Sequence, residues 1–181
     1  MKATGVIRRL DDLGRIVIPK EIRRTFRIRE GDPMEIFTNR NGEIILKKYS
    51  PIGDLGSFAV QYAEALAENT GYTICIFDRD QIIAAAGSNR KELINQPLSN
   101  ELEEIIENRS VLVRNGQNGA GLAIQGADNE YQKQVIAPIL CQGDAIGAVV
   151  FFIKREEAGS NEADKKLAST AADFLGKQME I

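Results

Sequence analysis

The sequence predicts an α+β protein of two domains: a small strand-rich domain, then a larger sandwich of helices on an antiparallel sheet. Three observations predict it. Lys and Arg outnumber Asp and Glu by twelve to seven over residues 1–50, whereas the rest of the chain holds eleven against nineteen. Short β-branched segments alternate with turn residues over the first fifty positions. Beyond them, the segments follow the order helix, hairpin, helix, strand, hairpin, helix, which is typical of α+β folds.

Composition argues against several classes of function. The chain has 181 residues, of which 43% are hydrophobic and 27% charged, and no apolar run approaches 18 residues, so we expect a globular protein without a membrane span. The start, Met1 to Thr4, lacks the apolar segment of a secretory signal. The chain has no histidine, and its two cysteines, Cys75 and Cys141, stand far apart in apolar runs. We therefore expect buried, inert thiols in a reducing cytoplasm, no catalytic residue, no metal and no cofactor.

The first fifty residues predict a small β-rich domain with one short helix. The expected elements are a strand over 4–10, a turn at 11–14, a strand over 15–18, a helix over 20–28 and a hairpin of strands 34–37 and 44–48. Pro19 suits the first position of the helix, whose face carries Ile22 and Phe26. Asn41-Gly42 is the strongest short signal for a hairpin turn.

A domain of about fifty residues rarely holds a sufficient core without disulfides or a metal. The apolar content of residues 1–50 is nevertheless large. We therefore expect two copies to merge their cores, so that dimerisation is part of folding.

Residues 51–181 predict the larger domain. The expected elements are a helix over 54–69, a hairpin of strands 72–77 and 81–86, a helix over 100–108, a strand over 111–113, a loose Gly-rich segment over 116–126, a hairpin of strands 134–140 and 145–153, and a closing helix capped by Ser160. The first helix is expected to turn an apolar stripe toward the core, part of which could also meet a second subunit, namely Leu55, Phe58, Ala59, Tyr62 and Leu66. On the last helix four residues share one row, namely Leu167, Ala171, Phe174 and Gln178.

Residues 5–25, GVIRRLDDLGRIVIPKEIRRT, strongly resemble the signature of AbrB-type transition-state regulators, and the resemblance continues to Tyr49. It implies a swapped-hairpin β-barrel in which two protomers lend strands to one barrel. It also implies the residues that bind DNA. The DNA-binding arginines of the family match Arg8, Arg15, Arg23 and Arg24, and Arg9 stands at another commonly basic position. Arg27 and Arg29 lack this support and are expected to be ordinary surface charges.

Arginine suits such a surface because its planar guanidinium group fits both phosphate oxygens and guanine edges. A two-fold dimer would double the set. No side chain in this segment indicates recognition of particular bases, and the resemblance implies a loose consensus among the DNA sequences bound. We therefore expect DNA shape to contribute to recognition.

The carboxyl-terminal part is similar to GAF domains. Residues 135–140 (VIAPIL) and 143–149 (GDAIGAV) resemble the last GAF hairpin. The resemblance implies a GAF-like sandwich over 51–181 for regulation and oligomerisation, with the first and last helices pairing across subunits to give a tetramer. GAF-type domains often hold a small ligand, and the candidate lining here is 83–88 and 116–126, for a ligand of unknown identity.

The two resemblances together imply a DNA-binding transcriptional regulator of the transition-state and sporulation type, an activator or a repressor. Its expected partners are double-stranded DNA, a second copy through residues 1–50 and a small ligand, with no membrane, and its expected location is the nucleoid in the cytoplasm. Two alternatives remain. One is an antitoxin-like protein with a swapped-hairpin head, and the other is a GAF-type redox enzyme that uses Cys75 or Cys141.

Overall fold

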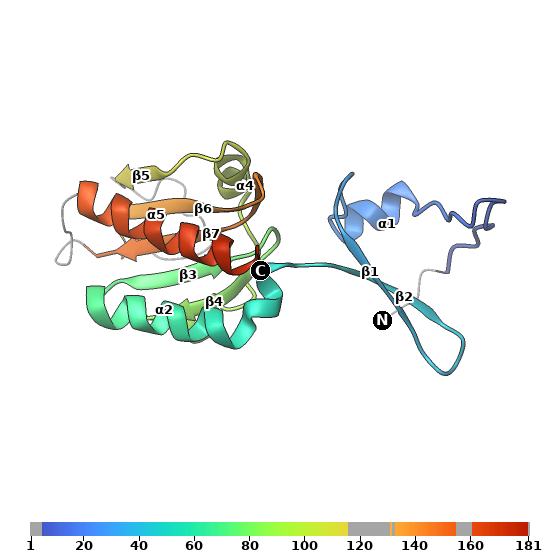
Figure 1. Cartoon of the computed structure of the whole chain (residues 1–181), viewed down its shortest axis with the longest axis horizontal. Coiled ribbons are helices and arrows are strands. Elements are labelled where there is room, and N and C mark those ends of the chain that lie inside the picture. Colours follow the sequence, from blue (N-terminus) through green and yellow to red (C-terminus); the bar gives the residue numbers. More distant parts are fainter. Residues whose placement is uncertain (1–4, 116–130, 132, 155–160, 181) are drawn as a thin grey trace. The chain divides into compact units, whose positions relative to one another are not determined.

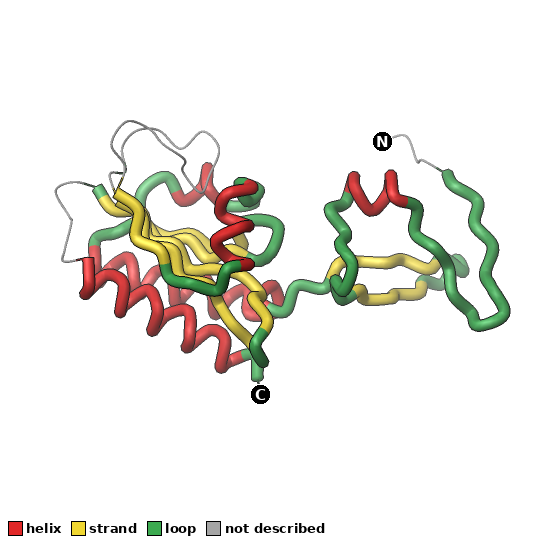
Figure 2. The backbone as a smooth tube through the Cα atoms, turned by 90° about the horizontal axis from the view of Figure 1, so that it is seen from above, coloured by secondary structure: helices red, strands yellow, loops and turns green. Residues whose placement is uncertain are grey.

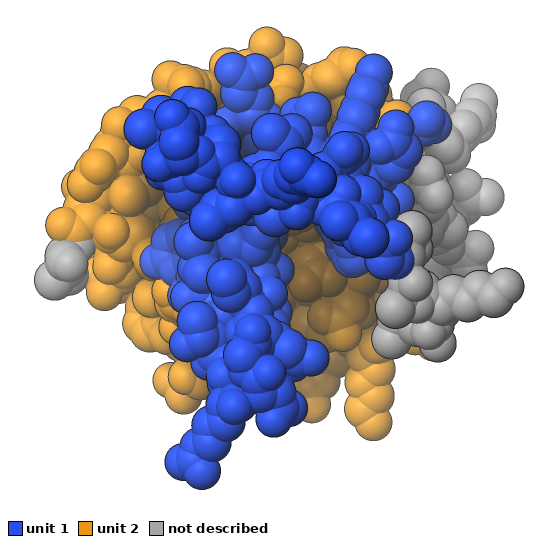
Figure 3. Space-filling model, turned by 90° about the vertical axis from the view of Figure 1, so that its right-hand side faces the viewer, with its two compact units in different colours: residues 1–49 blue, residues 50–181 orange. Residues whose placement is uncertain are grey.

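The structure of the chain is a computed structural model that describes residues 5–115, 131, 133–154 and 161–180. It divides into two compact units, residues 1–49 and residues 50–181, which Figure 3 colours separately. Among the described residues, no helix is both long and apolar enough to cross a membrane. The two units are described in turn.

The first unit contains one short helix and one hairpin. Its elements are α1 (Lys20–Thr25), β1 (Met34–Thr38) and β2 (Ile44–Lys48). The strands pair antiparallel from Met34 opposite Lys48 to Thr38 opposite Ile44. Gly42 in the turn has a φ of +79°, which glycine adopts without strain. The hairpin that Asn41-Gly42 predicts is therefore confirmed.

Neither of the two strands expected before α1 forms within the described residues. Residues 5–10 and 15–19 run as loops on either side of a turn (Figure 2). A β-strand needs a neighbouring strand to satisfy its N–H and C=O groups, and one chain offers these segments no such neighbour. The helix expected over 20–28 is also shorter, because it ends at Thr25 and Arg27 takes a φ of +51°.

The first unit has no hydrophobic core of its own. Of its described residues, only Pro19 is buried, and neither α1 nor the hairpin contains a buried residue. Twelve large apolar side chains are exposed, with Ile7 the most exposed at 93%. They are Val6, Ile7, Leu10, Leu13, Ile16, Val17, Phe26, Ile36, Phe37, Ile44, Ile45 and Leu46. Burying such a side chain contributes about 1.5–3 kcal/mol, so the unit lacks the main stabilising contribution of a folded domain.

The second unit is an antiparallel sheet with helices on both faces. The strands, in the order β4-β3-β7-β6-β5, are β3 (Thr73–Phe77), β4 (Ile82–Ala86), β5 (Leu112–Asn115), β6 (Lys133–Cys141) and β7 (Asp144–Ile153). The helices are η1 (Ile52–Leu55), α2 (Gly56–Thr70), α3 (Arg90–Leu93), α4 (Asn100–Glu107) and α5 (Asn161–Gln178). This order of elements agrees with the predicted α+β fold, except that α3 and η1 were not predicted.

Helices α2 and α5 lie side by side on one face of the sheet, and α4 lies on the other (Figure 1). The two faces hold two separate apolar clusters. The side chain of Ile52 belongs to the first cluster and is fully buried, which fixes η1 at the start of the unit. At the far end of the sheet, a buried ion pair between Lys133 and Asp164 ties α5 to β6, and the Tyr72 hydroxyl donates to Asp164 at 3.0 Å.

The predicted apolar rows of α2 and α5 are only partly right. Ala59 and Leu66 of α2 and Ala171 of α5 are buried as expected, but Leu167 and Phe174 are 37% and 38% exposed. The buried faces are completed by residues outside the rows, namely Ala63, Ala168, Ala172 and Leu175. Small side chains let both helices approach the sheet closely, and larger ones then fall at the margins of the buried face. The predicted loose segment 116–126 and the Ser160 cap lie outside the described residues.

Candidate nucleic-acid interface

A single carboxylate holds the turn that precedes Arg15. Asp11 Oδ1 accepts hydrogen bonds from the amides of Leu13 (3.0 Å) and Arg15 (2.7 Å), and Asp11 Oδ2 pairs with Arg15 Nε at 2.7 Å. The Asp11 amide donates to the Arg15 carbonyl at 3.1 Å, and Gly14 takes a φ of +75°. The turn predicted at 11–14 is therefore confirmed, and it presents Arg15 at its end.

Helix α1 presents two adjacent arginines. Arg23 and Arg24 lie in its last turn, and both are exposed. The Pro19 carbonyl accepts the Arg23 amide at 2.9 Å, so the helix begins directly after the proline. Glu21 in the first turn and the arginines in the last both suit the helix dipole. The two arginines therefore lie at the negative end of the helix dipole, where positive charges stabilise the helix.

Arg8 and Arg9 lie on the loop before the turn, and both are exposed. In the described part of the chain, no carboxylate forms an ion pair with Arg8, Arg9, Arg23 or Arg24. The Arg15 side chain remains 70% exposed although its Nε atom is paired. All five arginines predicted as site residues are thus open to a ligand, on three successive segments of the chain.

Arg27 and Arg29 lie in a different environment, next to the end of the hairpin. The Arg27 carbonyl accepts a hydrogen bond from Lys48 Nζ at 3.1 Å, and Lys48 also pairs with Asp32 at 3.2 Å. Asp32 in turn accepts the Arg29 amide at 2.8 Å. These contacts close the segment that follows α1, and they engage the backbone atoms of Arg27 and Arg29.

The sequence predicted the turn at 11–14 but not the contact between Asp11 and the Arg15 side chain. The available signal was the spacing of four residues between opposite charges on either side of a Gly-containing turn. The contact depends on the turn geometry, which brings the two side chains together although neither lies on a helix.

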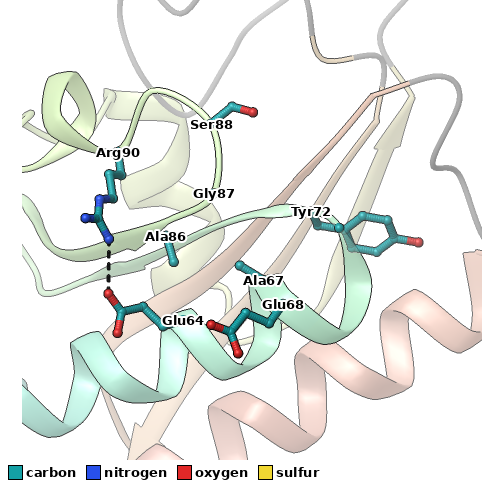
Figure 4. Close-up of a pocket in the computed structure, with 9 residues that line it drawn as sticks. Glu64, Ala67, Glu68, Tyr72, Ala86, Gly87, Ser88 and Arg90 are labelled. Atoms are coloured by element: carbon teal, nitrogen blue, oxygen red, sulfur yellow. Dashed lines mark hydrogen bonds and ion pairs between the residues drawn. The ribbon is translucent and has the colours of Figure 1, made fainter.

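The second unit contains a pocket of about 470 Å³ beside its edge strand β4. Figure 4 shows that Glu64 and Glu68 come from α2, whereas Ala86 and Ser88 come from the end of β4 and the loop after it. Arg90 pairs with Glu64 across the pocket at 3.1 Å. The predicted lining 83–88 thus contributes part of this pocket, whereas the predicted lining 116–126 falls outside the described residues.

The two thiols differ in environment. Cys75 is fully buried, and burial raises the pKa of its thiol far above the ordinary range. Cys141 is only partly buried, which corrects the expectation that both thiols are buried. It ends β6 next to the turn into β7, where side chains begin to leave the core. Its pKa is also raised, first by desolvation and then by the charges of Glu180 and Asp144. Among the described residues, no cluster of three metal-ligating side chains occurs.

An aromatic cluster joins α2 and α5. Tyr62 and Phe174 have ring centroids 5.2 Å apart, and Phe58 lies 6.0 Å from Phe174. All three rings are only partly buried. The two helices therefore share a group of aromatic side chains that stays partly exposed in a single chain.

Comparison with known proteins gives the class of the molecule. A family model described as "Stage V sporulation protein T C-terminal, transcription factor" matches residues 54–180, and one described as "Antidote-toxin recognition MazE, bacterial antitoxin" matches residues 7–54. The first model covers most of the chain, so the molecule is a two-domain transcription factor with its arginine-rich unit at the amino terminus.

The chain belongs to the stage V sporulation protein T family. It is 51% identical over 180 residues to stage V sporulation protein T of Bacillus subtilis (strain 168), covering 99% of both chains. Its amino-terminal unit is 55% identical over 51 residues to the transition state regulatory protein AbrB of the same organism, which is 28% of this chain and 52% of that protein. The sequence resemblance to AbrB-type regulators is thereby confirmed.

Solved structures show the fold of the second unit. The chain is similar to the PixJ GAF domain of Thermosynechococcus elongatus, with a TM-score of 0.55 and 11% identity over 74% of this chain and 89% of that chain. It is also similar to a free methionine-R-sulfoxide reductase of Thermoplasma acidophilum, with a TM-score of 0.56 and 14% identity over 71% of this chain and 94% of that chain. At these identities the likeness concerns the fold alone, and it confirms the predicted GAF-like domain.

Proposed function

We propose that this transcription factor binds double-stranded DNA through residues 1–50, paired with the same segment of a second copy, and acts as a regulator of the sporulation type in the cytoplasm. The observation that carries the proposal is the set of five exposed arginines, Arg8, Arg9, Arg15, Arg23 and Arg24, on a unit that lacks a core. Exposed guanidinium groups attract the phosphate backbone of a duplex, and among the described residues only Arg15 of these five has a carboxylate partner.

Dimerisation follows from the same unit. A single protomer of an intertwined barrel would expose apolar side chains and would contain segments whose backbone has no neighbouring strand. The first unit shows both features, with twelve exposed apolar side chains and two such segments. A second copy would bury the apolar groups and supply the missing strands. It would also double the arginines, so that one surface meets a long stretch of duplex.

Residues 51–181 are proposed to regulate the first unit and to extend the assembly to a tetramer. Support comes from the aromatic cluster of Phe58, Tyr62 and Phe174, because partly exposed rings on paired helices suit packing against another helix pair. The pocket beside β4 offers room for a small ligand, whose identity its mixed charges do not specify. The match to the MazE model covers the first unit only, so it favours the fold of that unit more than an antitoxin function.

The DNA proposal predicts that Arg15→Ala and Arg23→Ala each weaken DNA binding without loss of fold. The wild-type protein first selects a duplex from a random-sequence pool, and that duplex is the probe for all variants. With about six to ten phosphate contacts per dimer, affinity should fall roughly 10³- to 10⁵-fold between about 50 and 200 mM salt. Each variant should also flatten this salt dependence, because a dimer then loses two contacts.

Arg79→Ala is the matched control, because it removes an arginine from the second unit, between β3 and β4. It should leave the affinity and its salt dependence close to those of the wild type. Salt-independent binding, or equal loss from Arg79→Ala and Arg23→Ala, would contradict the proposed interface.

We further propose that the protein is not an enzyme of the GAF-type redox class. Both thiols have a raised pKa, so at a given pH less thiolate is available for nucleophilic attack. With a disulfide reagent at pH 8, native Cys75 should react only on unfolding, and Cys141 more slowly than glutathione. In Cys141→Ser the native protein should show no reacting thiol. A thiol that reacts faster than glutathione would contradict this proposal and support a GAF-type redox enzyme.

A further inference from the structure

The Asp11 carboxylate makes two kinds of contact at once. Its Oδ1 atom binds the backbone amides of Leu13 and Arg15, which closes the turn, and its Oδ2 atom binds the Nε atom of the Arg15 side chain. The Asp11 side chain is part of the exposed surface, as is that of Arg15. An acidic group therefore stands within the surface proposed to meet a polyanion.

Charge alone makes this position unfavourable, because a carboxylate near a phosphate lowers the affinity for DNA. The contact geometry nevertheless allows the Asp11 carboxylate to favour binding through Arg15. A guanidinium group bound through Nε is fixed along its inner edge, and its outer edge still points its remaining donors away from the pair. The Arg15 side chain, which otherwise samples many rotamers, is then ordered before DNA arrives, and ordering such a side chain on binding would weaken the complex.

Resting on the proposed role of Arg15 in DNA binding, we infer that Asp11 is a positioning residue, which holds the Arg15 guanidinium in its binding orientation by the Oδ2–Nε contact. The amide of Arg15, and after it the Arg15 guanidinium, lowers the pKa of Asp11 below its ordinary value. Asp11 is therefore ionised at neutral pH, as the contact with Nε requires. The net effect of Asp11 on DNA affinity is favourable despite its charge.

Asp11→Asn tests the inference, because asparagine keeps one part of the arrangement and removes the other. Its carbonyl oxygen can still accept from the two backbone amides, whereas its NH₂ group is a donor and cannot accept from Arg15 Nε. We expect roughly tenfold weaker binding of the selected duplex, since each dimer must now order two arginines on binding. The variant should unfold at nearly the wild-type temperature, because the turn remains closed.

Asp12→Asn is the matched control. Asp12 is adjacent and exposed, and its side chain forms no hydrogen bond or ion pair within the described residues. Both variants remove one negative charge per chain, so simple electrostatics predicts that both bind DNA more tightly. We expect Asp12→Asn to bind as tightly as the wild type or more tightly, and Asp11→Asn to bind more weakly.

A double-mutant cycle with Arg15→Ala separates positioning from a structural role. If Asp11 acts through Arg15, Asp11→Asn should no longer weaken binding in the Arg15→Ala background, and affinity there should stay equal or rise slightly because a negative charge is lost. The Arg15 Nε–H signal in the nuclear magnetic resonance spectrum of the free protein should exchange slowly with water in the wild type and quickly in Asp11→Asn.

The outcomes distinguish a failure of the positioning role of Asp11 from a failure of the DNA-binding role of Arg15. If Arg15→Ala weakens binding but Asp11→Asn tightens it as Asp12→Asn does, positioning is wrong and the DNA interface stands. If Asp11→Asn weakens binding equally with and without Arg15, Asp11 has a structural role only. If Arg15→Ala leaves affinity unchanged, the proposed role of Arg15 itself fails.

Discussion

Ile7→Asp is expected to abolish tight DNA binding by the full-length protein. Ile7 is 93% exposed in a single chain and precedes Arg8. Ile7 is the most exposed of the twelve apolar side chains that a second copy would bury, so we expect it to lie in the shared core of the dimer. An aspartate there would bury an unpaired charge, which costs several kcal/mol and should prevent the two amino-terminal segments from pairing.

Hydrogen exchange measures this pairing directly. In the wild type, the amides of residues 6–10 and 15–18 should be protected by strands of the partner, although one chain gives them no ladder. Ile7→Asp should remove that protection and lower the affinity for DNA by at least about a hundredfold, since single heads keep only half of the contacts. The second unit should retain its protected amides.

Ile7→Val is the control, because it keeps an apolar side chain at the same position and should cost only about 0.5–1.5 kcal/mol. Wild-type protein that exchanges the amides of residues 6–10 as fast as an unfolded peptide would contradict the intertwined dimer. So would an Ile7→Asp variant that binds DNA as tightly as the wild type.

Gly176→Ala is expected to destabilise the second unit strongly. Gly176 lies in α5 against the sheet, and a β-carbon built there would come within 2.1 Å of the Leu140 carbonyl oxygen. That oxygen belongs to the backbone of β6, so the helix must move away from the strand to admit even one methyl group. Such overpacking should cost about 3 kcal/mol or more. For a domain of this size the thermal midpoint should fall by roughly 10 °C.

Gly56→Ala provides the comparison, because Gly56 begins α2 and its position has open space where a β-carbon would lie. The same substitution there should be neutral or slightly stabilising, since alanine reduces the freedom of the unfolded chain. Equal midpoints for Gly176→Ala and Gly56→Ala would show that α5 does not pack as closely on β6 as the structure indicates.

Local chemistry explains which elements could be predicted. The hairpin around Gly42, the turn at Gly14 and the hairpin between β6 and β7 depend on residues close together in sequence, so turn residues and apolar runs identify them. The arginines of the interface were also found from sequence, because a signature of 21 residues carries them. Their exposure agrees with that prediction, and their contact with DNA stays a prediction.

Contacts between distant or differently packed segments could not be predicted in the same way. The strands expected over 4–10 and 15–18 have the right residues, but a strand exists only with a partner, and one chain supplies none. The apolar rows of α2 and α5 gave only part of the buried faces, because Ala168, Ala172 and Leu175 of α5 are also buried against the sheet. Periodicity does not reveal how closely a helix approaches.

The sequence by itself determined the order of the two domains, the basic character of the first and the turns that shape both, because charge, turn geometry and strand preference act between near neighbours. Only the tertiary structure decided that the Asp11 carboxylate binds the Arg15 side chain and that Gly176 lies against the Leu140 carbonyl of β6. It also decided that the first unit leaves its apolar side chains exposed. These features depend on which groups are brought within contact distance, and contact distance is a property of the folded backbone.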